Sequence, residues 1–213
     1  LTKAQGVFDE LPGRNIISWS TLISGYSQHG HGQDALACYL QMQNEGIFAN
    51  SITSTSILKA CSSSKSLDKG KMMHTQILSN GLWNKKIALG NALVDMYAKC
   101  GAIGKAKQVF DGLSIRDAVL WSALISGYTQ SGLYEDAIKC FHRMQLDSLC
   151  PDVVTFTCIL NACGRIGAID KGKKIHEDLA RHGLLRNHMV LGTALVDMYA
   201  KCGELEKAQE ALE

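Results

Sequence analysis

The sequence predicts an all-α fold, a right-handed superhelical solenoid of two-helix repeats, and three observations support this. The first is an internal duplication. The nine residues LVDMYAKCG occur from Leu93 and again from Leu195, 102 positions later. Residues 16–111 and 118–213 align without a gap and match at 41 of 96 positions, far more than two unrelated helical segments would give. The chain therefore contains the same sequence pattern twice.

The second observation is a shorter period inside the duplicated part. The apolar pattern and the glycines recur about every 31 to 36 residues, which is the range of helical repeat arrays. Alignment of strings such as SALISGYTQSG and TALVDMYAKCG gives repeat lengths of 35, 36 and 31, twice in succession. The expected repeats are 1–15 (the end of an incomplete repeat), 16–50, 51–86, 87–117, 118–152, 153–188 and 189–213 (truncated).

The third observation is that each repeat has the pattern of two helices. In the repeat from Ile16, apolar residues recur at three- and four-residue spacing, and HGHG at 29–32 ends the first helix. A second apolar stripe then follows at Ala35, Leu36, Tyr39 and Leu40. No segment shows strand-like alternation. Because so short a pair of helices cannot bury its own apolar faces, the repeats are expected to stack on one another.

Recurring residues indicate how the repeats are built. We expect the apolar residues at equivalent places to lie in the helix–helix core, namely Trp19, Trp121, Met42 and Met144. Three glycines stand where a left-handed helix C-cap belongs, namely Gly46, Gly81 and Gly183.

Composition excludes several classes of protein. With 46% hydrophobic residues the chain is globular and not disordered, and no apolar run reaches the roughly 20 residues of a membrane-spanning helix. The net charge of +2 and the pI near 8.1 are too weakly basic to indicate a nucleic-acid binder by themselves. The sequence therefore predicts a soluble protein that does not interact with membranes.

Cysteines and histidines give no evidence of a metal site. Six of the eight cysteines recur in pairs 102 residues apart, and no C-x-x-C string exists. We interpret the cysteines as small buried thiols in a reduced compartment, and expect neither a metal nor a cofactor. The KGK strings at 69–71 and 171–173 open second helices, and we expect their lysines to form a solvated basic face or to make a weak phosphate contact. His74 and His176 are expected to be packed or hydrogen-bonded.

The order and length of the repeats resemble a known family. ISWSTLISGYSQHGHGQDALACYLQMQNEG, SILKACSSSKSLDKGKMMH and NALVDMYAKCGAIGKAKQVFDGL, in repeats of 35, 36 and 31 residues, are similar to the P, L and S repeats of plant pentatricopeptide repeat proteins of the PLS subfamily. The resemblance covers essentially the whole chain, which is expected to be a fragment. It implies a solenoid that binds single-stranded RNA in a mitochondrion or chloroplast, one nucleotide per repeat. No transit peptide is visible in this fragment.

The resemblance also implies which residues contact RNA. In the family, the fifth and the last residue of a repeat read the edge of a base, and an apolar second residue lies between neighbouring bases. The fifth residues here are Ser20, Thr55, Asn91, Ser122, Thr157 and Thr193. The last residues are Asn50, Lys86, Asp117, Asp152 and His188. The second residues are Ile17, Ile52, Ala88, Val119, Val154 and Val190. Helix capping is an alternative explanation for the short polar fifth residues.

The family's pairing rules give an expected target. Ser20 with Asn50 implies adenine, Asn91 with Asp117 implies uracil, and Ser122 with Asp152 implies guanine. The pairs Thr55 with Lys86 and Thr157 with His188 match no dependable rule. The implied RNA is 5′-A-n-U-G-n-R-3′. Ala49 stands where most such repeats carry proline, as at Pro151, which leaves the loop before Asn50 less fixed.

Three classes of function fit a helical repeat protein of this kind. The P-L-S order implies the specificity part of an organellar cytidine-to-uridine RNA-editing factor. The alternative is a protein-interaction scaffold whose L repeats bind editing partner proteins, and a tetratricopeptide-type peptide binder is a third. The H-x-E and C-x-x-C strings of a zinc deaminase are both missing, so this chain is not expected to be an enzyme, although a missing C-terminal domain could be catalytic.

Overall fold

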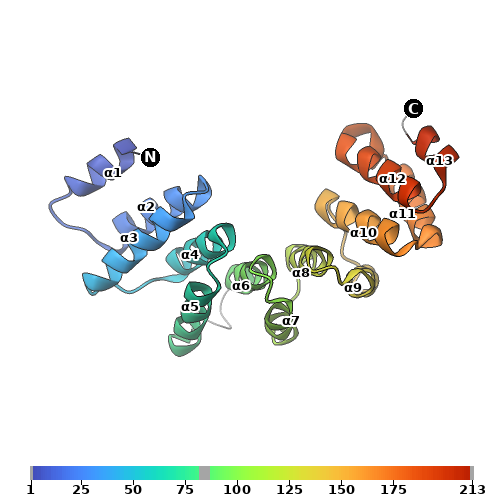
Figure 1. Cartoon of the computed structure of the whole chain (residues 1–213). Coiled ribbons are helices and arrows are strands. Elements are labelled where there is room, and N and C mark those ends of the chain that lie inside the picture. Colours follow the sequence, from blue (N-terminus) through green and yellow to red (C-terminus); the bar gives the residue numbers. More distant parts are fainter. Residues whose placement is uncertain (1, 82–86, 212–213) are drawn as a thin grey trace. The chain divides into compact units, whose positions relative to one another are not determined.

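The computed structural model describes residues 2–81 and 87–211, and over these residues every regular element is helical (Figure 1). The chain divides into an N-terminal half, Leu1–Ile115, and a C-terminal half, Arg116–Glu213. The division separates the two copies of the duplicated pattern. The predicted all-α repeat fold is confirmed.

The described part of the N-terminal half consists of helices and the segments between them. The helices are α1 (Thr2–Asp9), α2 (Ile16–Gln28), α3 (Gly32–Asn44), α4 (Ser51–Ser64), α5 (Leu67–Ser79), α6 (Ile87–Lys99) and α7 (Ile103–Asp111). Helices α2, α4 and α6 pack side by side, and each also packs on the helix that follows it in the chain. The result is a stack of helical hairpins in which α2, α4 and α6 form one layer.

The C-terminal half repeats this arrangement. Its helices are α8 (Ala118–Gln130), α9 (Tyr134–Leu146), α10 (Val153–Ile166), α11 (Ile169–Arg181), α12 (Met189–Lys201) and α13 (Leu205–Glu210), with a 3₁₀ turn at Leu184–Asn187. Here α8, α10 and α12 form the layer of first helices. The residues expected to start the six long repeats are also the first residues of α2, α4, α6, α8, α10 and α12. The assignment of those repeats to the P, L and S types stays a prediction.

The core lies between the helices of each half. Trp19, Trp121, Met42 and Met144 are all at most 1% exposed, as expected. Leu40, which was expected to belong to the apolar stripe of α3, is instead 45% exposed. Leu40 has the spacing of the apolar stripe along α3, but its side chain lies at the edge of the face that packs on neighbouring helices.

Glycine in the KGK strings allows two helices to approach closely. A Cβ on Gly70 of α5 would overlap the Sδ of Met96 on α6. In the other half, a Cβ on Gly172 would overlap the Sδ of Met198 in the same way. The strings recur because each glycine accommodates the methionine of the following LVDMYAKCG.

Helices end in left-handed turns, and two of these turns lack glycine. Gly46, Gly81 and Gly183 have positive φ, which confirms the expected caps. Ser148, the counterpart of Gly46, has φ 56°, and Lys65, the counterpart of Gly167, has φ 50°. A side chain in this region is strained by contact between Cβ and the backbone.

Within the part of the chain that the structure describes, no helix has the length and hydropathy that crossing a bilayer requires.

Candidate nucleic-acid interface

The second residues of the six long repeats are apolar side chains on the surface. Ile17, Ile52, Val119, Val154 and Val190 are 71%, 61%, 62%, 55% and 59% exposed, and Ala88 is also exposed. Each stands at the second position of α2, α4, α6, α8, α10 or α12. Branched aliphatic side chains normally bury themselves, so their regular exposure at the same helical position gives each half a row of apolar contacts available to a ligand.

The fifth residues lie one helical turn further along the same helices. The hydroxyls of Ser20, Thr55, Thr157 and Thr193 donate to the backbone carbonyl four residues earlier, with oxygen–oxygen distances from 2.5 to 3.1 Å. Ser20 and Ser122 are buried, at 7% and 8% exposed, whereas Thr193 is exposed. None of these residues is a helix cap, so the capping alternative for the fifth positions is wrong.

Capping belongs instead to the last residues of the repeats. Asn50 is the N-cap of α4, Asp117 of α8 and Asp152 of α10, and each side-chain oxygen accepts from the backbone N–H three residues later. The distances are 2.9, 2.8 and 2.7 Å. Asn15 caps α2 in the same way. Asn or Asp directly before an apolar periodic run was the available sequence signal for these caps.

His188 also stands at an N-cap position, before α12, but its side chain makes no capping hydrogen bond. Lys86 lies outside the described residues. These two residues belong to the pairs for which the family rules gave no base.

Two of the expected base-reading pairs are brought together. The Ser122 hydroxyl donates to Asp152, with 3.3 Å between Oγ and Oδ1. Ser20 and Asn50 are connected through Thr53, whose Oγ1 lies 2.7 Å from the Ser20 hydroxyl and 3.0 Å from Asn50 Oδ1. Thr155, the counterpart of Thr53, donates to Asp152 Oδ1 at 2.7 Å. The threonines three residues after Asn50 and Asp152, namely Thr53 and Thr155, were missed, although they align in the duplication.

The other pairs stay predictions, for different reasons. Asn91 belongs to the N-terminal half and Asp117 to the C-terminal half. Among the described residues, no hydrogen bond connects Thr157 with His188. For Thr193 no partner was predicted within this sequence.

A hollow of about 470 Å³ adjoins this row in the N-terminal half. The residues that line it include Gln28, Ile52, Thr55, Lys59 and Ala88. It therefore combines two apolar second residues, one hydroxyl fifth residue and a cation. This composition suits a planar base that stacks on an aliphatic group while its neighbouring phosphate meets Lys59.

The histidines and cysteines have structural environments. His74 Nδ1 lies 2.9 Å from the Tyr97 hydroxyl, and His176 Nδ1 lies 2.9 Å from that of Tyr199. Burial is the main cause that lowers the pKa of both histidines, with a smaller contribution from Lys105 at His74. Both are packed, as predicted. Among the described residues, no cluster of histidine, cysteine and carboxylate side chains could hold a metal ion.

The prediction for the cysteines was wrong in part. Cys38, Cys61 and Cys163 are buried, and burial raises the pKa of Cys61 to about 12. Four others are half-buried, and Cys150 is exposed. Cys150 has no cysteine partner in the duplication, because its counterpart is Phe48, so it does not share the helix-packing place of the recurring cysteines.

Known proteins provide the comparison. The family model described as the PPR repeat family matches residues 14–63 and 116–165, and the PPR repeat model matches 91–114, 154–184 and 193–213. A chloroplastic pentatricopeptide repeat-containing protein of Arabidopsis thaliana is 37% identical over 213 residues, which is 100% of this chain and 34% of that protein. A mitochondrial one from the same plant is 35% identical and is matched over 98% of this chain and 35% of its own length. This chain thus spans about a third of these relatives.

Solved structures agree on the fold. The crystal structure of the maize pentatricopeptide repeat protein PPR10 has a TM-score of 0.67 and 20% identity, over 94% of this chain and 29% of that one. PPR10 in complex with an 18-nt psaJ RNA element has a TM-score of 0.54 and 17% identity, over 98% and 36%. From the repeat models, the relatives and the helical hairpins together, the chain belongs to the pentatricopeptide repeat family.

Proposed function

We propose that this chain binds single-stranded RNA sequence-selectively, with one nucleotide facing each repeat. The observation that carries the proposal is the row of exposed aliphatic second residues, each one turn from a short polar fifth residue. Exposed aliphatic side chains stack on the faces of bases, and neighbouring hydroxyl and carboxylate groups bond to base edges. The crystal structure of PPR10 in complex with an RNA element supports the same kind of partner here.

The Ser122–Asp152 pair offers a specific chemistry. A carboxylate accepts hydrogen bonds and cannot donate them, so Asp152 suits a base edge that carries N–H donors. Guanine presents such donors on its Watson–Crick edge, whereas the amide of Asn50 offers both a donor and an acceptor. The pairing rules of the family give the proposed target 5′-A-n-U-G-n-R-3′, read by Ser20 with Asn50, Asn91 with Asp117, and Ser122 with Asp152.

The wider biological role follows from the proposed P-L-S repeat order. We propose that the chain is the specificity part of a C-to-U RNA-editing factor in a mitochondrion or chloroplast. The curated relatives carry names that place them in these organelles, which supports the location. The repeats themselves supply recognition and not catalysis.

The decisive experiment is a titration of labelled A-n-U-G-n-R RNA against a scrambled sequence. Stacking and edge contacts contribute on the order of 1 to 3 kcal/mol each before the strand is ordered, so we expect micromolar or weaker binding. A double variant, Val119→Ala with Val154→Ala, should weaken binding without lowering the melting temperature.

Leu146→Ala is the matched control, because Leu146 is an 83% exposed aliphatic residue on α9, outside the proposed row. Equal loss of binding in the control and the double variant would refute the row as an interface. Nanomolar binding that ignores sequence would refute the selectivity.

A further inference from the structure

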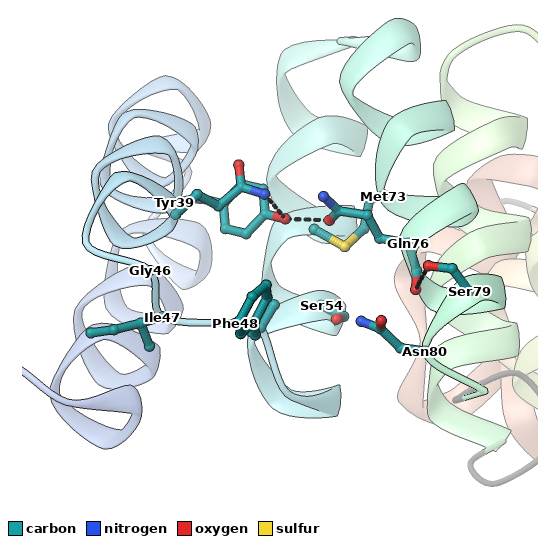
Figure 2. Close-up of a pocket in the computed structure, with 11 residues that line it drawn as sticks. Tyr39, Gly46, Ile47, Phe48, Ser54, Met73, Gln76, Ser79 and Asn80 are labelled. Carbon is teal, nitrogen blue, oxygen red and sulfur yellow. Dashed lines mark hydrogen bonds between the residues drawn. The ribbon is translucent and has the colours of Figure 1, made fainter.

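A second cavity lies in the N-terminal half, away from the row of second residues. It has a volume of about 340 Å³ and lies among α3, α4, α5 and the loop that joins α3 to α4 (Figure 2). Its sides include Tyr39, Phe48, Met73, Gln76 and Asn80. All eleven described residues that line it are uncharged. A volume of this size holds one large side chain or a small molecule.

The wall of the cavity contains polar groups that are free to bond. Ser54 is 2% exposed, lines the cavity, and its hydroxyl makes no hydrogen bond in the part of the chain that the structure describes. The same holds for the side-chain amide of Asn80. Gln76 accepts from the Tyr39 hydroxyl, which in turn accepts from Gln43 at 2.9 Å, and this leaves the NH₂ of Gln76 without a bond among the described residues. The Ser54 hydroxyl therefore faces the open cavity, where a ligand can bond to it.

The C-terminal half indicates that the fold does not require this cavity. The residue that corresponds to Ser54 is Phe156, and the one that corresponds to Tyr39 is Phe141. Their rings meet edge to face with 5.9 Å between centroids, and Phe156 is 6% exposed. The counterpart of Gln76 is Asp178, which forms an ion pair of 2.8 Å with Arg181. The same backbone position thus accepts a phenylalanine that fills the space.

The aromatic ring at the mouth is a further difference between the halves. Phe48, which is 85% exposed, lies on the α3–α4 loop beside Ser54, with Ser54 between Phe48 and Asn80 in Figure 2. The residue that corresponds to Phe48 is Cys150. Over the described residues, it is therefore the N-terminal half that combines an open cavity, a serine hydroxyl in the cavity wall and an exposed ring at the mouth.

We propose that this cavity binds an uncharged peptide segment of a partner protein, with one apolar side chain inserted between Phe48 and Met73. The peptide groups that flank this side chain bond to Ser54, Gln76 and Asn80. Serine, glutamine and asparagine side chains donate and accept, as a peptide group requires. No charged side chain among the described lining residues is available to neutralise a formal charge on the ligand.

A nucleotide fits less well for the same reason. A base in the cavity would bring phosphates to its edge, and none of the described residues that line the wall is a cation. The proposed RNA contacts lie on different residues, so this inference stands or falls separately from the proposed function.

The test is an NMR titration of the whole chain with N-acetyl-leucinamide, which carries one apolar side chain between two amide groups, and with the capped tripeptide acetyl-Gly-Leu-Gly-amide. We expect resonances of Ser54, Gln76 and Asn80 to shift with millimolar affinity. The charged control is the α-amide of N-acetyl-aspartic acid, whose side-chain carboxylate is free. Uridine is the nucleoside control. Ser54→Phe, which copies the residue of the C-terminal half, should abolish the shifts, and Gln41→Phe, an aromatic addition at an exposed position of α3, should leave them unchanged.

Asn80→Leu is a second variant. Because Asn80 is exposed, this change should leave the fold intact even if Ser54→Phe does not fold. Loss of one hydrogen bond should weaken binding by about fivefold. RNA titration of each folded variant should match the wild type. The proposal is overturned if neither capped peptide shifts these resonances, if uridine binds as well as the peptides do, or if Asn80→Leu binds them unchanged.

Discussion

The Ser122 hydroxyl on α8 and the Asp152 carboxylate before α10 lie within hydrogen-bonding distance, 3.3 Å from Oγ to Oδ1. Asp152 also caps α10 through the backbone N–H of Thr155. One carboxylate therefore joins two helices and stands beside a proposed base-reading hydroxyl. A capping residue is held by the helix that it begins, so this position presents its remaining lone pairs in a fixed direction.

Changing Asp152 to Asn should change the preferred base and leave stability nearly unchanged. Asparagine and aspartate cap helices about equally well, so the free energy of unfolding should move by less than about 0.5 kcal/mol. The resulting pair has the same residues as Ser20 with Asn50, so the preference should shift from guanine to adenine by about 1 to 3 kcal/mol. Competition titrations with both RNAs measure this. Asp152→Ala is the comparison that removes the cap as well, at a cost of about 1 kcal/mol.

Asn91→Thr tests the uracil position. Under the family's pairing rules, threonine at position 91 together with Asp117 is a guanine-type pair, so binding should then favour 5′-A-n-G-G-n-R over 5′-A-n-U-G-n-R by about 1 to 3 kcal/mol. Asn161→Thr is a control, since Asn161 is a half-buried asparagine on α10 outside the proposed set. If Asn91→Thr weakens the binding of both RNAs equally, or lowers the melting temperature, this residue has a packing role.

Ser148→Gly should stabilise the protein. Ser148 has φ 56°, where its Cβ is strained, and glycine removes the strain at some cost in chain entropy, for a net gain of about 0.5 to 1 kcal/mol. Gly46→Ser introduces the same strain at the equivalent turn, φ 73°, and should destabilise the protein by a similar amount. Urea unfolding of the three proteins measures both effects. If Ser148→Gly and Gly46→Ser change the free energy of unfolding in the same direction, the interpretation of strain at these turns is contradicted.

The half-buried histidines His74 and His176 should make stability depend on pH. Because burial lowers the pKa of His74 and His176, the unfolded chain binds their protons more readily than the folded chain. Their contribution is complete above the unfolded pKa of about 6.5 and is lost as the pH falls through the lower folded value. Urea unfolding near neutral pH and in mild acid should show a smaller loss of stability for His74→Gln with His176→Gln than for the wild type. An identical loss would show that other groups account for it.

Thiol reactivity should follow exposure. Cys150 is exposed, whereas burial raises the pKa of Cys38 and Cys163 to about 11. Because the thiolate is the reactive form, a disulfide reagent should modify Cys150 first and the buried cysteines only on unfolding. Cys150→Ser should remove the fast phase. A fast phase that persists in this variant would point to one of the half-buried thiols.

The sequence by itself determined the helices and the apolar faces on which they stack. Trp19, Trp121, Met42 and Met144 could be assigned to the core because periodicity along one helix decides which side chains share a face. The left-handed turn at Gly46 was also predictable, since it depends on local backbone geometry.

Only the tertiary structure decided how residues about 30 positions apart meet. The bond from Ser122 to Asp152, the bridge through Thr53 and the cavity beside Ser54 each depend on how closely successive helices pack. Helical periodicity sets the direction of a side chain but not its distance from the next helix. For that reason the exposed edge position of Leu40, and the dual role of Asp152 as cap and partner, could not be read from the spacing of apolar residues.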